Sequence, residues 1–190
     1  MPLPNVKRYT LADALDWPGD ERIELIEGRT VMMAPPKRIH QEVSGSLFNQ
    51  FFNFLNGKKC KVYAAPFAVR PFEKDGDKPE DVDTMLEPDI TVVCDPNKLD
   101  DIGCKGAPDI VIEVLSPSTA RNDRIVKYRL YERAGVPEYW IVNPETKIVT
   151  VHLLEDGRYH SPLAYTEQAL VPVSIWEGFN IDLSLVFPKE

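Results

Sequence analysis

The chain has 190 residues, of which 43% are hydrophobic and 27% charged, and its 22 basic and 30 acidic side chains give a net charge of -8. This composition predicts one globular domain whose core needs neither metals nor disulfides, and it excludes a disordered chain. No apolar run reaches the roughly 18 residues of a membrane-spanning helix, and the first residues contain no apolar signal segment, so we expect a cytoplasmic protein. The three cysteines are odd in number and lie in no CxxC spacing, which indicates a reducing compartment without disulfides.

The N-terminal third contains two helix patterns separated by a strand pair. A short helix is expected over 11–17, with Thr10 as N-cap and Pro18-Gly19 as its stop. Residues 22–35 predict two short strands that turn at Glu27-Gly28. Apolar side chains then recur at helical spacing, which predicts a long helix over 39–57.

The rest of the chain alternates between strand and helix patterns. We expect strands within 60–71, 87–95 and 107–116, a helix over 121–134, and a strand pair within 138–144 and 147–159. The helix and the strands on either side of it form a βαβ unit, whose two strands should be parallel. Together these elements predict an α/β (α+β) protein with a mixed sheet, organised as a single domain over 1–190.

One carboxylate interrupts a strongly apolar segment, because Glu113 lies within residues 110–115. Near-continuous apolarity predicts a strand that is buried on both faces. A buried carboxylate has to be paired, protonated or bound to a cation. Glu113 is therefore either the ion-pair partner of an arginine at the sheet edge, or a metal ligand or catalytic acid–base.

A second carboxylate, Asp89, stands at the head of the preceding apolar strand. It can approach Glu113 if the two strands are neighbours in the sheet, which we predict. Asp109 lies on the same strand as Glu113, about four residues away at roughly 3.3 Å each, and is too far to share an ion with it.

Two further charged residues deserve a functional interpretation. Lys127 lies beside the inward stripe of the 121–134 helix, which we assign to Val126, Leu130 and Ala134 at about 100° per residue. It either reaches back over the end of the Glu113 strand or extends to water and pairs with Asp123. Glu24 also interrupts an apolar strand. It either belongs to the same site as Glu113 or forms an ion pair with a nearby arginine, Arg22 or Arg29.

These residues resemble the PD-(D/E)XK nuclease superfamily, and more closely the Uma-type family of restriction-endonuclease-like proteins, over nearly the whole chain. The resemblance rests on ELIEG at 24–28, APPKRIHQEV at 34–43, EPDITVVC at 87–94, PDIVIEVLSPST at 108–119, the spaced Asp123 and Lys127, and AGVPEYWIVNP at 134–144. It implies a restriction-endonuclease-like fold, a central mixed β-sheet flanked by helices, with Asp89 and Glu113 as the metal-binding pair. The superfamily lysine would stand two residues after Glu113, where this chain has Leu115, so the resemblance implies that Lys127 has taken its role.

The implied activity is that of a metal-dependent endonuclease acting on DNA. Asp89 and Glu113 would hold Mg²⁺ (or Mn²⁺), Lys127 would position the attacking water, and Glu24 would add a ligand or accept a proton. His40, Arg121 and Arg124 are the expected substrate contacts, and a homodimer is expected because duplex cleavage needs two sites. The alternatives are a catalytically inactive nuclease-fold module for nucleic-acid binding or assembly, and a small-molecule hydrolase that uses the same carboxylates.

The acidic balance does not exclude DNA, because it is local. Residues 73–101 contain eleven acidic side chains and three lysines, which accounts for the whole net charge of -8. Residues 121–133 carry five basic and two acidic side chains, so the helix with Lys127 could face phosphate.

Overall fold

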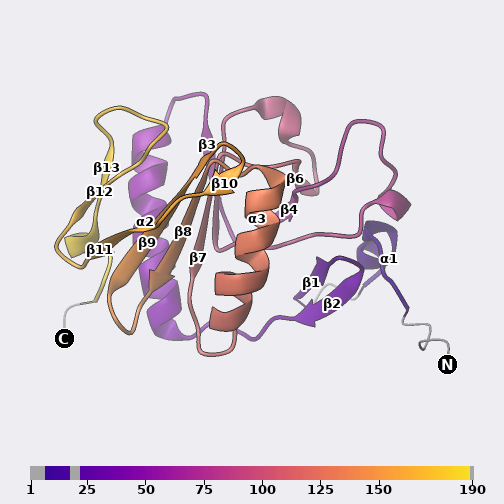
Figure 1. Ribbon diagram of the computed structural model, residues 1–190, viewed down its shortest axis with the longest axis horizontal. Coiled ribbons are helices and arrows are strands. Elements are labelled where there is room, and N and C mark those ends of the chain that lie inside the picture. The colour runs from indigo at the N-terminus through magenta and orange to yellow at the C-terminus, as the bar shows by residue number, and fades with distance from the viewer. Residues whose placement is uncertain (1–6, 18–21, 189–190) are drawn as a thin grey trace.

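A seven-stranded mixed sheet forms the centre of the protein (Figure 1). The computed structural model describes residues 7–17 and 22–188. The strands follow the order β10-β9-β8-β7-β5-β3, and β11 also pairs with β9. Within these described residues β7 and β8 are parallel and the other neighbouring strands of this sheet are antiparallel. The strands are β3 (Lys61–Ala64), β5 (Ile90–Val93), β7 (Ile110–Val114), β8 (Glu138–Asn143), β9 (Ile148–Glu155), β10 (Arg158–Tyr159) and β11 (Leu163–Thr166).

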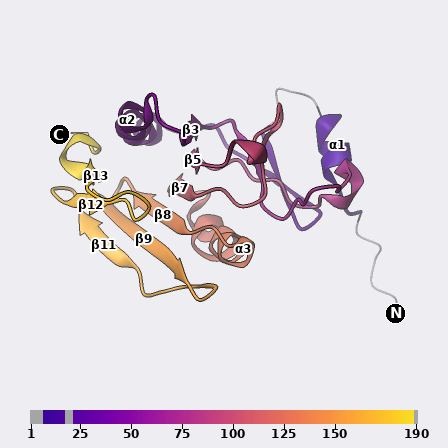
Figure 2. The same ribbon diagram turned by 90° about the horizontal axis from the view of Figure 1, so that it is seen from above.

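Two helices cover opposite faces of this sheet (Figure 2). Helix α2 (Arg38–Leu55) buries four apolar side chains at helical spacing: Val43, Leu47, Phe51 and Leu55. They pack in one core cluster with the inward side chains of β5, β7 and β8. Helix α3 (Tyr128–Ala134) contributes Leu130 and Tyr131 to the cluster on the other face. The predicted class, a mixed sheet flanked by helices, is confirmed.

Shorter elements surround the sheet. They are α1 (Leu11–Leu15), the hairpin β1 (Ile23–Ile26) and β2 (Arg29–Met32), the pair β4 (Ala68–Arg70) and β6 (Gly103–Lys105), the pair β12 (Leu170–Pro172) and β13 (Asn180–Asp182), and 3-10 turns at Pro79–Asp81, Pro96–Lys98 and Leu183–Leu185. The predicted hairpin turn at Glu27-Gly28 is confirmed, with both residues at positive φ. The Pro18-Gly19 stop predicted for the first helix lies outside the described residues. No helix of the part that the structure describes has the length and apolarity needed to span a bilayer.

The crossover from β7 to β8 begins with a π-helical segment, Asn122–Lys127, which continues into α3. Asp123 and Lys127 are buried on the same side as Leu130 and Tyr131, at spacings of three and four residues, whereas Val126 is 36% exposed. The prediction that Val126 belongs to the inward stripe is therefore wrong. The stripe was drawn through the apolar side chains of the segment, whereas two charged residues that pair with each other occupy the inward positions. The predicted parallel βαβ unit is confirmed by the pairing of β7 with β8.

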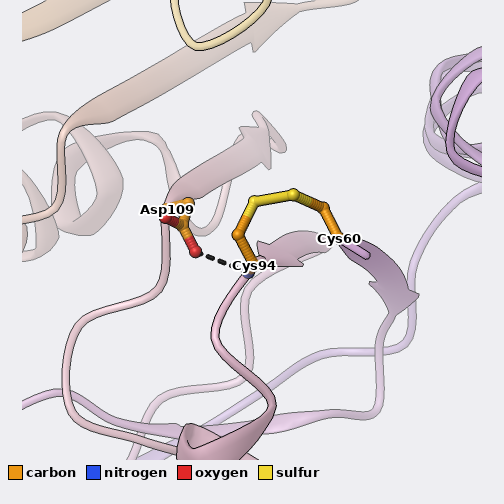
Figure 3. Close-up of a disulfide and its surroundings, with 3 residues drawn as sticks. All are labelled: Cys60, Cys94 and Asp109. Carbon is orange, nitrogen blue, oxygen red and sulfur yellow. Dashed lines mark hydrogen bonds between the residues drawn. A yellow bond between two sulfur atoms is a disulfide. The ribbon is translucent and has the colours of Figure 1, made fainter. Parts of the chain in front are cut away.

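A disulfide joins Cys60 and Cys94, so the expectation of a chain without disulfides is wrong (Figure 3). The antiparallel register of β3 and β5 pairs Lys61 with Val93, and one step further places the two cysteines opposite each other. The Cys94 backbone N–H also donates a 2.7 Å hydrogen bond to the carboxylate of Asp109. The third cysteine, Cys104, is free and buried.

Candidate active site

Asp89 and Glu113 face each other at one end of the β5–β7 pair. The antiparallel register joins Ile90 to Ile112, and the next step places Asp89 across from Glu113. Directly opposed residues point to the same face and have Cβ atoms about 4.5–5.5 Å apart. The prediction that the two strands are neighbours is confirmed. Asp109 lies at the opposite end of the pair, beside Cys94, as its distance along the strand requires.

Asp89 is held in place by a backbone amide and by a histidine. Its Oδ2 accepts a 2.7 Å hydrogen bond from the Val114 N–H and lies 3.1 Å from Nε2 of His40. His40 stands on the first turn of α2, so the start of this helix lies against the end of β5 that follows Asp89. Burial alone would lower the pKa of His40, but the Asp89 carboxylate outweighs burial and raises it. The other oxygen of Asp89 accepts no hydrogen bond from the residues that the structure describes.

Lys127 lies at the centre of a buried cluster of carboxylates. Its Nζ is 2.7 Å from Oε1 of Glu24, 2.9 Å from Oε1 of Glu113 and 3.6 Å from Oδ1 of Asp123. None of these four side chains is more than 4% exposed. The alternative in which Lys127 extends to water is therefore excluded. Tyr131 adds a second donor to Glu113, with its hydroxyl 3.1 Å from Oε1.

Glu24 reaches the cluster from strand β1. Its Oε1 also accepts a 2.9 Å hydrogen bond from the Glu87 N–H, on the segment that leads into Asp89. Arg22, one of the partners considered for Glu24, instead forms a 3.0 Å ion pair with the Glu87 side chain. The hairpin is thus fastened to the segment that leads into Asp89, and the Glu24 carboxylate reaches Lys127.

The cluster carries more negative charge than its single lysine balances. Burial raises the pKa of Glu113 well above its usual value, although Lys127 acts against this effect. Burial likewise raises the pKa of Asp123. Burial would lower the pKa of Lys127, but the three surrounding carboxylates raise it, so the ammonium form is retained. Such a cluster gains stability from any further cation, whether a proton or a metal ion.

A cavity of about 230 Å³ opens onto these groups. His40, Asp89, Glu113, Asp123 and Lys127 all contribute to its wall, so it collects side chains from α2, both strand ends and the π-helical segment. A fold that places five titratable groups from four elements around one cavity marks this cavity as the candidate active site.

Comparison with known proteins identifies the family. The family model described as "Uma2: Putative restriction endonuclease" matches residues 11–184 of this chain. The chain belongs to the Uma2 family. A solved structure, a putative nuclease belonging to DUF820 from Anabaena variabilis ATCC 29413, has the same fold, with a TM-score of 0.73 at 19% identity, and the match covers 94% of this chain and 97% of that one. The uncharacterized protein slr1290 of Synechocystis sp. is 28% identical over 165 residues, which are 86% of this chain and 83% of that protein. The predicted family and the restriction-endonuclease-like fold are confirmed.

The donor set of this Uma2 protein fits a hard divalent cation. All its candidate ligands are carboxylate oxygens, which suit Mg²⁺ or Mn²⁺ better than zinc. The buried Oδ1 of Asp123 has no hydrogen-bond partner among the described residues, although the Lys127 ammonium lies 3.6 Å from it. Within residues 7–17 and 22–188 no three His, Cys, Asp or Glu side chains converge as a ready metal cage. Mg²⁺ commonly takes only one or two carboxylates and keeps several waters, so a site with two carboxylates is within its usual range.

The arginines expected as substrate contacts are exposed and do not line the cavity: Arg121 directly precedes the π-helical segment and Arg124 lies within it. Their contact with substrate stays a prediction. Asp123, in contrast, was considered only as a pairing partner of Lys127, although it lines the cavity. The sequence signal for Asp123 was its spacing of four residues from Lys127, which places both residues on one face of a helix.

Proposed function

We propose that this protein is a metal-dependent endonuclease that hydrolyses DNA phosphodiester bonds. The observation that carries the proposal is the buried cluster around Lys127, in which three carboxylates surround one ammonium group. Two of them, Glu113 and Asp123, line a cavity that Asp89 also lines. Membership of a family described as "Putative restriction endonuclease" supports the same reaction class.

Asp89 and Glu113 would hold Mg²⁺ (or Mn²⁺), and Asp123 offers a further carboxylate. Bound there, the ion would neutralise charge on the scissile phosphate and lower the pKa of a water. His40 and the Val114 N–H orient Asp89, because both lie within hydrogen-bond distance of its Oδ2.

Lys127 would position the attacking water and stabilise charge that develops on the phosphate. Its raised pKa keeps it protonated, so it acts as a hydrogen-bond donor and not as a base. Glu24, 2.7 Å from the same ammonium, restricts Lys127 to one orientation and is available as a proton acceptor.

The test compares Glu113→Gln with the parent protein on supercoiled plasmid in Mn²⁺ or Mg²⁺. The substitution keeps the shape of the side chain and removes its charge, so nicking should fall by at least a hundredfold. Asp109→Asn is the matched control, because Asp109 lies on the same chain segment but at the far end of the β5–β7 pair. Equal nicking by the parent and Glu113→Gln would refute the assignment.

The rival function is an inactive nuclease-fold module that binds nucleic acid or supports assembly. Its supporting observation is that Lys127 already neutralises part of the cluster without any metal. Titration calorimetry with Mn²⁺ separates the two functions, because the rival requires either no binding or binding that Asp89→Asn leaves unchanged. Light scattering with and without DNA tests the expected homodimer.

A further inference from the structure

A second cavity of about 140 Å³ adjoins the candidate active site. The two cavities share Arg22, Pro36, His40 and Asp89 in their walls, so they meet at the end of β5 beside Asp89. From there the second cavity extends along α2 past Gln41 and Gly45 to Phe48. Ala64 and Ala65, at the end of β3, form the facing wall. We call this cavity the α2 slot.

Gly45 in the middle of α2 has no structural explanation in the fold. Glycine weakens a helix interior because it has more conformational freedom to lose than any other residue. A Cβ added at Gly45 would meet no heavy atom of the described residues within 4 Å, so close packing does not require glycine there. Its φ is also outside the left-handed region that favours glycine. What the missing side chain does provide is open space in the α2 slot.

The polar groups of the slot are suited to a flat, hydrogen-bonding ligand. The Gln41 amide makes no side-chain hydrogen bond with the described residues, so both its donors and its acceptor are available. The Ser44 hydroxyl donates to the Gln41 carbonyl, which leaves its own oxygen free to accept. Phe48 is half-buried and stacks on Phe52, with ring centroids 5.8 Å apart and an angle of 22° between the rings. An aromatic face next to an amide is the combination by which proteins bind nucleobases.

We infer that the α2 slot binds the base of a nucleotide adjacent to the scissile phosphate. The inference rests on the proposed nuclease function, because His40 and Asp89 connect the slot directly to the catalytic cavity. A base that enters a slot between a helix and a strand has left its duplex stack. The substrate class that follows is DNA with an unpaired base at the cleavage site, such as a single strand, a loop or a frayed end.

The test measures binding of short fluorescein-labelled single strands by anisotropy, in a Glu113→Gln background that leaves them uncleaved. Gly45→Leu fills the slot, and Phe48→Leu removes the aromatic face while keeping an apolar side chain. Each should weaken binding by roughly 5- to 150-fold, the effect of losing one base–aromatic stack. Asn53→Leu is the matched control, because it adds the same side chain on an exposed position of α2 that does not line the slot.

Oligonucleotides with one abasic residue, placed at each position in turn, identify the base that enters. At one position, removing the base should weaken binding to the protein with Gly45 intact as much as Gly45→Leu weakens binding of the intact strand. When the abasic strand is combined with Gly45→Leu, the loss of affinity should be no larger than either change causes alone. Thermal unfolding of Gly45→Leu should occur at or above the temperature of the Glu113→Gln parent, because leucine replaces a glycine inside a helix without a clash. Mn²⁺ calorimetry on Gly45→Leu with Glu113 intact should match the protein without substitutions, which shows that the catalytic cavity is unchanged.

Two results overturn the inference in different ways. If the Glu113→Gln protein binds single strands and neither Gly45→Leu nor Phe48→Leu weakens binding, the slot assignment fails and the proposed function stands. If the Glu113→Gln protein binds no DNA and the parent cleaves none, both fail together.

Discussion

Replacing Lys127 by Met should strongly destabilise the metal-free protein. Met keeps an unbranched chain of similar length but removes the charge, leaving the buried carboxylates of Glu24, Glu113 and Asp123 without their counter-ion. Removing one partner of a buried ion pair typically costs about 3–5 kcal/mol. With a urea m-value of about 2 kcal/mol/M, the unfolding midpoint should fall by roughly 1.5–2.5 M.

The size of this loss should depend on pH. The pKa of Glu113 and that of Asp123 are raised in the folded protein, so the folded state holds more protons than the unfolded chain above pH 4.5, the usual pKa of a glutamate. Stability from these groups is therefore present at low pH and declines as pH rises. Without Lys127 the carboxylates repel each other more strongly, so Lys127→Met should lose more unfolding free energy relative to the parent at pH 8 than at pH 5.

Urea unfolding in EDTA, followed by circular dichroism at both pH values, measures these effects. Arg124→Met is the matched control, because this exposed arginine lies on the same π-helical segment. Its unfolding free energy should change by less than about 0.5 kcal/mol. Adding Mn²⁺ should restore part of the stability of Lys127→Met, by about 2.7 kcal/mol at a hundred times the dissociation constant. Equal midpoints for Lys127→Met and Arg124→Met at pH 8 would refute the reasoning.

Three further predictions concern residues around and beyond this cluster. Asp123→Asn removes a carboxylate from the cavity wall and should weaken Mn²⁺ binding about tenfold or more in calorimetry, whereas Asp109→Asn should leave it unchanged. The double variant Cys60→Ser, Cys94→Ser should lose about 2–4 kcal/mol of unfolding free energy in urea, because the disulfide joins residues 34 apart in the sequence. A reductant should lower the unfolding free energy of the parent but not that of the variant. Burial lowers the pKa of His152 below 6.5, so its contribution to stability is lost as pH falls; His152→Met should show a smaller drop in melting temperature between pH 7 and pH 5 than the parent.

Patterns along the chain were sufficient for the elements with strong periodicity. Four apolar residues at helical spacing located α2, and an apolar strand on each side of a helix located the parallel pair β7 and β8. The π-helical segment was not predictable in this way, because its apolar spacing does not differ from that of an α-helix. The inward side of this segment was predicted from apolarity alone, and Val126 was assigned to the wrong side because the inward positions hold the paired charges of Asp123 and Lys127.

Long-range contacts escaped prediction for a different reason. The proximity of Asp89 and Glu113 could be predicted, because Asp89 begins one apolar strand and Glu113 lies within the next apolar strand of the chain. The contact of His40 with Asp89 depends on how α2 lies against the sheet, and no spacing encodes that placement. The Cys60–Cys94 bond likewise depends on the register of β3 with β5, which joins cysteines 34 positions apart in the sequence.

The position of Leu115 explains why the lysine of this site comes from a helix. Residues 113 and 115 point to the same face of their segment, since side chains alternate along a strand. Leu115 is 7% exposed and packs in the core cluster with Leu130 and Tyr131, beneath α3. A lysine at 115 would have to place its ammonium in or beside that apolar cluster. The helix that creates the cluster instead supplies Lys127, whose Nζ lies 2.9 Å from Glu113, and the Tyr131 hydroxyl, which donates to the same oxygen. One element therefore provides both the apolar cover of the strand and the cation beside its carboxylate, so a leucine at 115 is compatible with an intact site.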